Sequence, residues 1–106
     1  MPSTKSYLQF IQDQLSGVEE VSWRTMMGES ILYFNGKVVG GIYDDRLLVK
    51  PTRSASQLLP DAPSELPYEG AKPMLLVEDV ENRALLRELV ARVGADLPAP
   101  KKRKPR

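Results

Sequence analysis

The hydrophobic and polar positions of residues 21–50 alternate or form short apolar blocks, and this pattern predicts a continuous antiparallel meander. Val21 and Trp23 alternate with polar neighbours, and a period of two is typical of a strand with one buried face. Gly28 interrupts this strand, because glycine adopts positive φ freely. Residues 31–34 are apolar at every position, which predicts a central strand covered on both faces.

Three dipeptides mark the places where the meander turns or bulges: Asn35-Gly36, Gly40-Gly41 and Asp44-Asp45. Asn-Gly between apolar runs predicts a type I′ hairpin turn, because both central residues of that turn need positive φ. The glycine pair inside the third strand predicts a bulge or the close approach of another group. The aspartate pair predicts the next tight turn. A fourth strand then runs over 46–50, and Pro51 ends it by removing a backbone donor.

Apolar residues at helical spacing lie on both sides of the meander. Before it, Ser3 or Thr4 is a candidate N-cap and Gly17 is a natural stop for a first helix. That helix has these apolar positions: Tyr7, Leu8, Phe10, Ile11 and Leu15. Near the end of the chain, Asp79 is a candidate N-cap and Gly94 marks the expected end of a last helix. Its apolar positions form the clearest amphipathic pattern in the chain: Leu85, Leu86, Leu89, Val90 and Val93.

The segment between the meander and the last helix is less regular. Residues 52–59 predict a short helix, and residues 60–73 contain four prolines and a glycine, which predicts an irregular loop. We expect Leu66 and Tyr68 to hold this loop against the body. Residues 74–77 then form a buried strand by composition.

These elements predict an α+β domain over residues 1–97. The sheet is antiparallel, with a four-stranded meander plus one later strand, and it carries an N-terminal and a C-terminal helix. Residues 98–106 are proline-rich and basic, so we expect them to be a disordered tail.

The residue types that are missing exclude several kinds of site. The chain has no cysteine and no histidine, so it has no disulfide, thiolate ligand, cysteine nucleophile or imidazole base. We therefore expect no catalytic residue, metal or cofactor. No apolar run approaches the ~20 residues that span a bilayer, and the N-terminus lacks the pattern of a signal peptide. We expect a cytoplasmic protein without membrane contact.

The net charge of +1 conceals an uneven distribution. Residues 101–106 carry five of the 15 basic residues and no acidic residue, so the remainder has 10 basic against 14 acidic residues, a balance of −4. A folded nucleic-acid-binding domain is usually basic on its binding face. The tail itself is a candidate for phosphate contact, with a purely solubilising role as the alternative. Its candidate residues are Lys101, Lys102, Arg103, Lys104 and Arg106.

The acidic residues and the aromatic residues each have a structural and a functional interpretation. Acidic residues lie at the second turn and at the start of the last helix: Asp44, Asp45, Glu78, Asp79 and Glu81. Turn and capping roles are favoured for them, against a shared proton or a Mg²⁺ site. Aromatic residues on strands suit core packing, with base stacking as the alternative. They are Tyr33, Phe34 and Tyr43.

The first strand also carries the candidate residues for protein binding. Met26 and Met27 are adjacent, so one of them must face away from the core if the strand alternates. Methionine fills core gaps and also occurs on adaptable binding surfaces. Trp23 is the only tryptophan, and tryptophan is enriched at interface hot spots. We predict a partner-binding patch of Trp23, Arg24, Met26 and Met27, with core packing as the alternative.

Three strings give the chain a resemblance to the N-terminal domain of the TfoX/Sxy family. They are WRTMMGE at 23–29, YFNGKVVGGIYDDRLLVKPT at 33–52 and YEGAKPMLLVED at 68–79. The resemblance spans about residues 4–97. It implies a fold similar to secretion-chaperone-like domains, with a helix on each side of a curved sheet. In proteins that add a C-terminal TfoX domain, the family is associated with regulating natural competence together with the cyclic-AMP receptor protein. We expect a stand-alone N-terminal domain here.

The resemblance and the composition together predict a non-enzymatic regulatory or protein-interaction module of bacterial, cytoplasmic type. It would act through a protein partner or as a homodimer. The alternative is weak, sequence-independent association with nucleic acid through the tail. A third hypothesis, a small carboxylate enzyme, requires a pocket in which two acidic residues converge.

Overall fold

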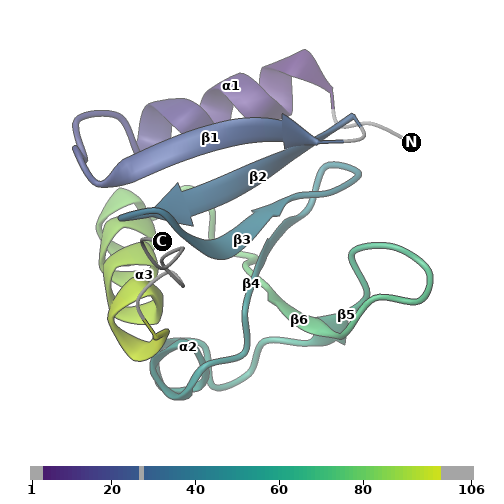
Figure 1. Ribbon diagram of the computed structural model, residues 1–106, viewed down its shortest axis with the longest axis vertical. Helices are drawn as coiled ribbons and strands as arrows, with labels where there is room; N and C mark the ends of the chain where they lie inside the picture. Colours follow the sequence, from purple (N-terminus) through teal and green to yellow (C-terminus); the bar gives the residue numbers. More distant parts are fainter. Residues whose placement is uncertain (1–3, 27, 99–106) are drawn as a thin grey trace, which may run out of the picture.

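The computed structural model describes residues 4–26 and 28–98 and shows three helices and six strands in this part of the chain (Figure 1). In chain order they are α1 (Lys5–Gln14), β1 (Val21–Met26), β2 (Glu29–Phe34), β3 (Lys37–Ile42), β4 (Leu47–Val49), α2 (Arg53–Leu58), β5 (Ser64–Glu65), β6 (Met74–Leu76) and α3 (Arg83–Asp96). The strands form one sheet in the order β1-β2-β3-β4-β6-β5, with every neighbouring pair antiparallel. The predicted α+β class and the four-stranded meander are confirmed.

The predicted turns of the meander are also confirmed. Asn35 and Gly36 have φ values of 53° and 78°, as the type I′ turn between β2 and β3 requires. Asp44 and Asp45 have φ values of 52° and 56°. Aspartate tolerates this left-handed region better than most residues, and the pair closes the hairpin between β3 and β4.

A register shift in β3 decides which side chains face which side of the sheet. Leu32 pairs with Gly40, whereas the next residue, Tyr33, pairs with Val38, so Val39 is an additional residue in β3. The bulge therefore lies at Val39, one residue before the predicted glycine pair. At Gly40 the alternative prediction applies, which is the close approach of another backbone. A Cβ on Gly40 would lie 2.1 Å from the carbonyl oxygen of Leu48. Only glycine allows β3 and β4 to pair at this point.

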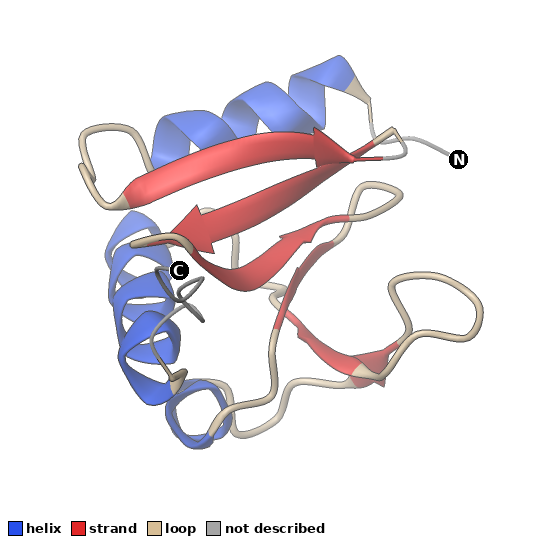
Figure 2. Ribbon diagram, viewed as in Figure 1, coloured by secondary structure: helices blue, strands red, loops and turns tan. Residues whose placement is uncertain are grey.

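The two faces of the sheet are covered very differently (Figure 2). Side chains of α1 and α3, such as Ile11 and Leu89, share one buried cluster with Leu32 and Val39 of the sheet. The implied arrangement of one helix on each side of the sheet is therefore wrong, because both long helices pack on the same face. The opposite face, which we call the open face, carries a second apolar cluster without helix residues: Ile31, Tyr33, Val38, Tyr43, Leu48, Met74 and Leu76.

The segment predicted to be irregular over 60–73 contains a short edge strand. Ser64 and Glu65 of β5 pair with Leu75 and Met74 of β6. The sheet therefore has two strands after the meander, and the irregular part is divided into residues 60–63 and 66–73. A pairing of two residues has no periodicity of its own, so the sequence pattern could not reveal it.

The bounds of α3 differ from the expected ones. Asn82, and not Asp79, is the N-cap, because its side-chain oxygen accepts a hydrogen bond from the backbone N–H of Leu85. The helix continues past Gly94 to Asp96, and Gly94 is buried against the ring of Phe34. Gly94 therefore serves the packing of α3 on β2. None of the helices in residues 4–26 and 28–98 combines the length and apolar character of a membrane span.

Candidate functional site

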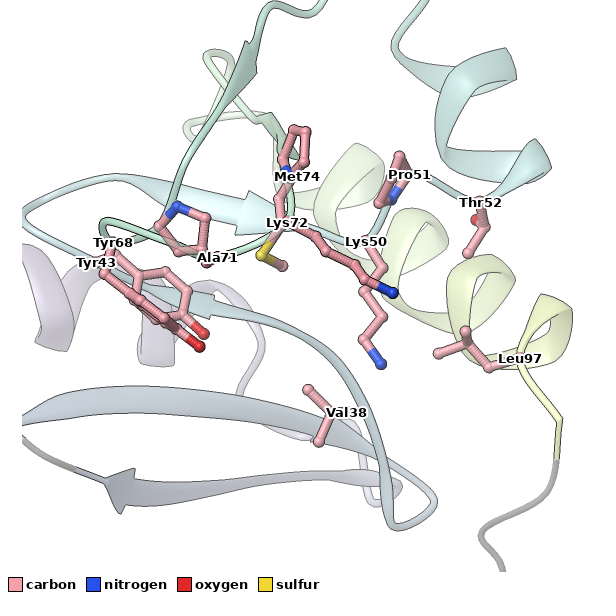
Figure 3. Close-up of a pocket in the computed structure, with 12 residues that line it drawn as sticks. Val38, Tyr43, Lys50, Pro51, Thr52, Tyr68, Ala71, Lys72, Met74 and Leu97 are labelled. Carbon is pink, nitrogen blue, oxygen red and sulfur yellow. The ribbon is translucent and has the colours of Figure 1, made fainter.

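The open face is hollowed where β3, β4, β6 and the 66–73 loop meet (Figure 3). The cavity has a volume of about 580 Å³, within the range of about 300–1,000 Å³ that is typical of small-molecule sites. Its wall is mostly apolar and includes Val38, Tyr43, Met74 and Leu97. We call it the lysine cavity, because its cationic lining residues are Lys50 and Lys72 and none of its lining residues is acidic.

The two lysines reach the lysine cavity from different elements. Lys50 follows Val49, the last residue of β4, and the alternation of the strand directs it to the open face. Lys72 belongs to the 66–73 loop. Figure 3 shows both side chains extending toward the same part of the cavity. Within the described residues, neither ammonium group has a hydrogen bond or an ion pair.

Lys37 shows what a structural lysine looks like in the same protein. Its ammonium group donates hydrogen bonds to the carbonyl oxygens of Gly94 and Leu97, at 2.6 Å and 3.4 Å. These bonds satisfy carbonyl groups at the C-terminal end of α3, where positive charge is favoured by the helix dipole. Lys50 and Lys72 have no comparable role in holding the fold.

Arg46 positions the loop that forms one wall of the lysine cavity. Its guanidinium group donates to the Glu65 carboxylate at 2.8 Å and to the carbonyl oxygens of Leu66 and Pro67 at 3.1 Å and 3.4 Å. It also donates to the Tyr43 carbonyl oxygen at 3.1 Å. One side chain therefore ties the β3–β4 hairpin to the start of the 66–73 loop. The expected anchors of that loop, Leu66 and Tyr68, are themselves 48% and 63% exposed.

Tyr43 and Tyr68 stand between the lysine cavity and a second hollow. Their ring centroids are 6.3 Å apart with planes tilted by 57°, a geometry that aromatic pairs prefer. Tyr43 is only 6% exposed, whereas Tyr68 is 63% exposed. Burial raises the pKa of the Tyr43 hydroxyl, and the nearby Tyr68, Glu29 and Tyr33 side chains act in the same direction. The Tyr43 hydroxyl is therefore neutral at physiological pH.

The second hollow lies toward β1 and β2, and we call it the Met26 hollow. It has a volume of about 420 Å³ and is lined by Met26, Glu29, Ile31, Tyr43 and Tyr68. Met26 is 51% exposed, so an apolar and adaptable side chain stands at its edge. The Glu29 Oε1 atom is buried without a hydrogen-bond partner among the described residues.

The structure separates the residues predicted to form a partner-binding patch. Trp23 is partly buried and packs against the cluster on the helix-covered face, which is the core role given as its alternative. Arg24 and Met26 lie on the opposite side of β1, toward the open face. The Arg24 guanidinium lies 5.8 Å from the ring centroid of Tyr33. Met27 lies outside the described residues.

The strand aromatics do not form one stacking surface. Phe34 packs with the helix-covered cluster, whereas Tyr33 and Tyr43 belong to the open face. Tyr33 is partly buried under Arg24 and Tyr43 is buried. Core packing is therefore the role that the structure supports for all three. The tail candidates Lys101, Lys102, Arg103, Lys104 and Arg106 fall outside the described residues.

The acidic residues have structural roles or are dispersed. Asp45 accepts hydrogen bonds from the backbone N–H and the hydroxyl of Thr4, at 2.7 Å and 3.2 Å, and so ties the start of α1 to the β3–β4 turn. Asp61, Glu78 and Asp79 line a smaller hollow of about 240 Å³ but are all exposed to solvent. Within residues 4–26 and 28–98, no group of three acidic residues lies close enough to hold a metal ion.

Sequence reasoning missed the residues that shape the lysine cavity. Lys50 looks like an ordinary polar residue at a strand end, Lys72 lies in an irregular loop, and Arg46 follows a turn. Their spacing along the chain carries no motif, because only the pairing of β4 with β6 brings them together. The one signal for the cavity in the sequence was Tyr68, an aromatic residue in a proline-rich loop.

Comparison with known proteins agrees with the architecture. The family model described as the TfoX N-terminal domain matches residues 13–94. A Spirochaeta aurantia protein described as an uncharacterized 12.7 kDa protein in the trpE 5′ region is 37% identical over 105 residues, which cover 98% of this chain and 91% of that protein. No solved structure matches the chain. The matched region runs from α1 to α3 and includes the whole sheet, so the chain belongs to the TfoX N-terminal domain family.

Proposed function

We propose that this chain is a non-catalytic, cytoplasmic interaction module of regulatory type, which pairs with a second copy of itself along β1. The observation that carries the proposal is that β1 is an edge strand of six residues with little cover. Four of these residues are exposed: Ser22, Arg24, Thr25 and Met26. Membership of the TfoX N-terminal domain family supports the regulatory part of the proposal.

The backbone of β1 supports pairing with another strand. The Asn35 N–H donates to the Glu20 carbonyl oxygen at 2.8 Å, and hydrogen-bonded pairs alternate with non-hydrogen-bonded pairs along an antiparallel ladder. The backbone groups of Trp23 and Thr25 therefore point away from β2. An edge strand with outward N–H and C=O groups is a template for a further strand.

The side chains favour a second copy as the partner. If two β1 strands pair antiparallel about Trp23, Arg24 of one copy lies opposite Ser22 and diagonally next to Glu20 of the other copy. Opposite charges at diagonal positions attract across strands. The two Met26 side chains then lie at the two ends of the shared ladder, each beside the Met26 hollow of its own copy.

The chemistry of the open face supports a non-catalytic role. The two cavities on this face contain one acidic lining residue between them, Glu29. A carboxylate acid–base mechanism needs two acidic groups whose environments separate their pKa values. The acidic residues of the smaller hollow, Asp61, Glu78 and Asp79, are all exposed to solvent, so they form no enclosed pair of acids.

Sedimentation velocity tests the proposal over protein concentrations from low micromolar to several hundred micromolar. We expect the full chain to shift from monomer to dimer as its concentration rises. Thr25→Pro removes one outward N–H, so it should abolish the dimer, whereas Thr25→Val keeps the N–H and should leave the dimer intact. Met26→Lys is a second variant with an unchanged backbone and should weaken the dimer. A full chain that stays monomeric throughout would overturn the proposal.

A further inference from the structure

We infer that the lysine cavity is a binding site for a small amphipathic anion, with the anionic group between Lys50 and Lys72 and the apolar part against Val38, Tyr43 and Met74. This site lies apart from the β1 edge and stands independently of the proposed self-association. Its ligand class follows from the charge and the shape of the cavity.

The two ammonium groups carry the first part of the inference. They extend into one cavity from β4 and from the 66–73 loop (Figure 3), and the cavity has no acidic lining residue. The ion pairs in the described part of the chain lie elsewhere, at Arg46–Glu65 and Arg92–Glu88. Two like charges near each other are unfavourable unless an anion lies between them. The cavity is therefore electrostatically suited to a carboxylate, sulfonate or phosphate.

The apolar lining carries the second part. Val38 and Met74 are partly buried and pack against the buried residues of the open face, in a cluster that includes no residue of α1, α2 or α3. A cavity of about 580 Å³ with a mostly apolar wall and a few convergent polar groups is the usual form of a small-molecule site. An inorganic anion would leave this apolar surface exposed to water, so the ligand should have an apolar body as well.

The anchoring of the loop carries the third part. Arg46 holds residues 65–67 through three acceptors, and Tyr68 then lies against Tyr43. One wall of the cavity is therefore held in place by contacts that do not involve the ligand. A wall formed in advance lowers the entropy cost of binding.

The experiment uses two fluorescent probes that share one aromatic body. The first, 8-anilino-1-naphthalenesulfonate, carries a sulfonate, and the second, N-phenyl-1-naphthylamine, does not. We expect the full-length chain to bind the sulfonate probe saturably with one site. The double variant Lys50→Gln/Lys72→Gln should weaken this binding by about tenfold or more, the size expected for the loss of a charge-assisted hydrogen bond. The same variant should leave the affinity for the uncharged probe unchanged.

Two further variants separate the cavity from other sources of binding. Ala71→Trp places a large side chain in the cavity wall and should weaken both probes. Lys101→Gln/Lys102→Gln/Lys104→Gln removes positive charge from the tail and should change neither. Near-ultraviolet circular dichroism of each variant checks that the fold is kept, because the sulfonate probe also binds expanded states.

Three outcomes would overturn the inference. They are an absence of saturable binding, an equal loss of both probes in the Lys50/Lys72 variant, and a loss of the sulfonate probe in the tail variant alone. An absence of saturable binding would show that the site does not exist, and an equal loss of both probes would show that it has no preference for anions. A loss in the tail variant alone would show that the probe binds the tail and not the cavity. Each is distinct from a failure of self-association, which the Thr25 and Met26 variants report. Displacement of the sulfonate probe by decanoate, but not by acetate, would support a ligand with both an anionic group and an apolar body.

Discussion

Gly40 shows how a single residue decides the geometry of this sheet. A Cβ at this position would lie 2.1 Å from the Leu48 carbonyl oxygen and 2.9 Å from the Val49 Cα atom. Both atoms belong to the backbone of β4, so no side-chain rotation relieves the contact. The glycine therefore lets β4 approach and pair with β3 beside the bulge at Val39.

Gly40→Ala should lower the free energy of unfolding by about 3 kcal/mol, since overpacking against a rigid neighbour costs roughly this amount. Gly70→Ala is the matched control. Gly70 has a φ of 87° and open space around it, so alanine there should cost only about 1 kcal/mol from the left-handed backbone. Urea unfolding of the two variants and the unmodified chain measures both values. Equal losses would show that the contact with β4 is not the cause.

At the scale of elements, the hydrogen bonds of single side chains join segments that are far apart in the sequence. Arg46 joins the β3–β4 hairpin to β5 and the 66–73 loop. Asp96, the last residue of α3, accepts hydrogen bonds from the Ser54 backbone N–H at 2.7 Å and from the Ser54 hydroxyl at 3.0 Å. The Asp96 carboxylate thereby joins α3 to the first turn of α2, whose N-cap is Thr52. These connections place Leu97 beside the lysine cavity.

The contact between Asp96 and α2 should make stability depend on acidic pH. The hydrogen bond from the Ser54 backbone lowers the pKa of the Asp96 carboxyl below its ordinary value of 3.8. The unfolded chain therefore binds more protons than the folded chain between these two pKa values. The stabilisation by Asp96 is fully present above the unfolded pKa and is lost as the pH falls through the folded pKa.

Asp96→Asn should accordingly be less stable than the unmodified chain at neutral pH, and the difference should shrink as the pH falls below about 4. Urea unfolding from pH 7 to pH 3 measures this difference. Asp61→Asn is the control, because Asp61 is an exposed aspartate without a hydrogen bond in the described residues. A difference for Asp96→Asn that does not change with pH would contradict the role assigned to the charged carboxylate.

At the scale of the whole molecule, charge is divided between an acidic body and a basic tail. Residues 1–100 have 10 basic and 14 acidic residues, and residues 101–106 have five basic residues and no acid. Lys50 and Lys72 of the open face line a mostly apolar cavity. In the sequence they are not continuous with the basic residues of the tail. Any association with nucleic acid should therefore depend on the tail and be independent of base sequence.

Fluorescence anisotropy with labelled double-stranded DNA tests this dependence. If the five tail cations contact phosphate, the logarithm of the binding constant should fall with the logarithm of salt concentration with a slope of about −4 to −5. The variant Lys101→Gln/Lys102→Gln/Lys104→Gln should reduce the slope to about −2. Lys50→Gln/Lys72→Gln, which removes two positive charges from the body, should leave it unchanged. The absence of binding by the full chain near physiological salt would exclude a role in nucleic-acid association.

Short-range features of the sequence determined most of the fold. The Asn35-Gly36 turn, the alternation in β1 and the apolar spacing of α1 and α3 each act within a few residues, so their consequences are visible in the sequence. The helix cap at Asn82 was missed because several capping residues lie close together before α3. The strand at Ser64 was missed because a two-residue pairing depends on β6 and not on its own sequence.

What only the tertiary structure decided is which face each side chain occupies and which distant residues meet. The bulge at Val39 changes the facing of β3, and the packing of both α1 and α3 on one side leaves the other side open. The lysine cavity depends on this outcome, because Lys50 and Lys72 meet only when β4 pairs with β6. Contacts between residues far apart in the chain depend on long-range strand pairing, and the local sequence pattern does not encode that pairing.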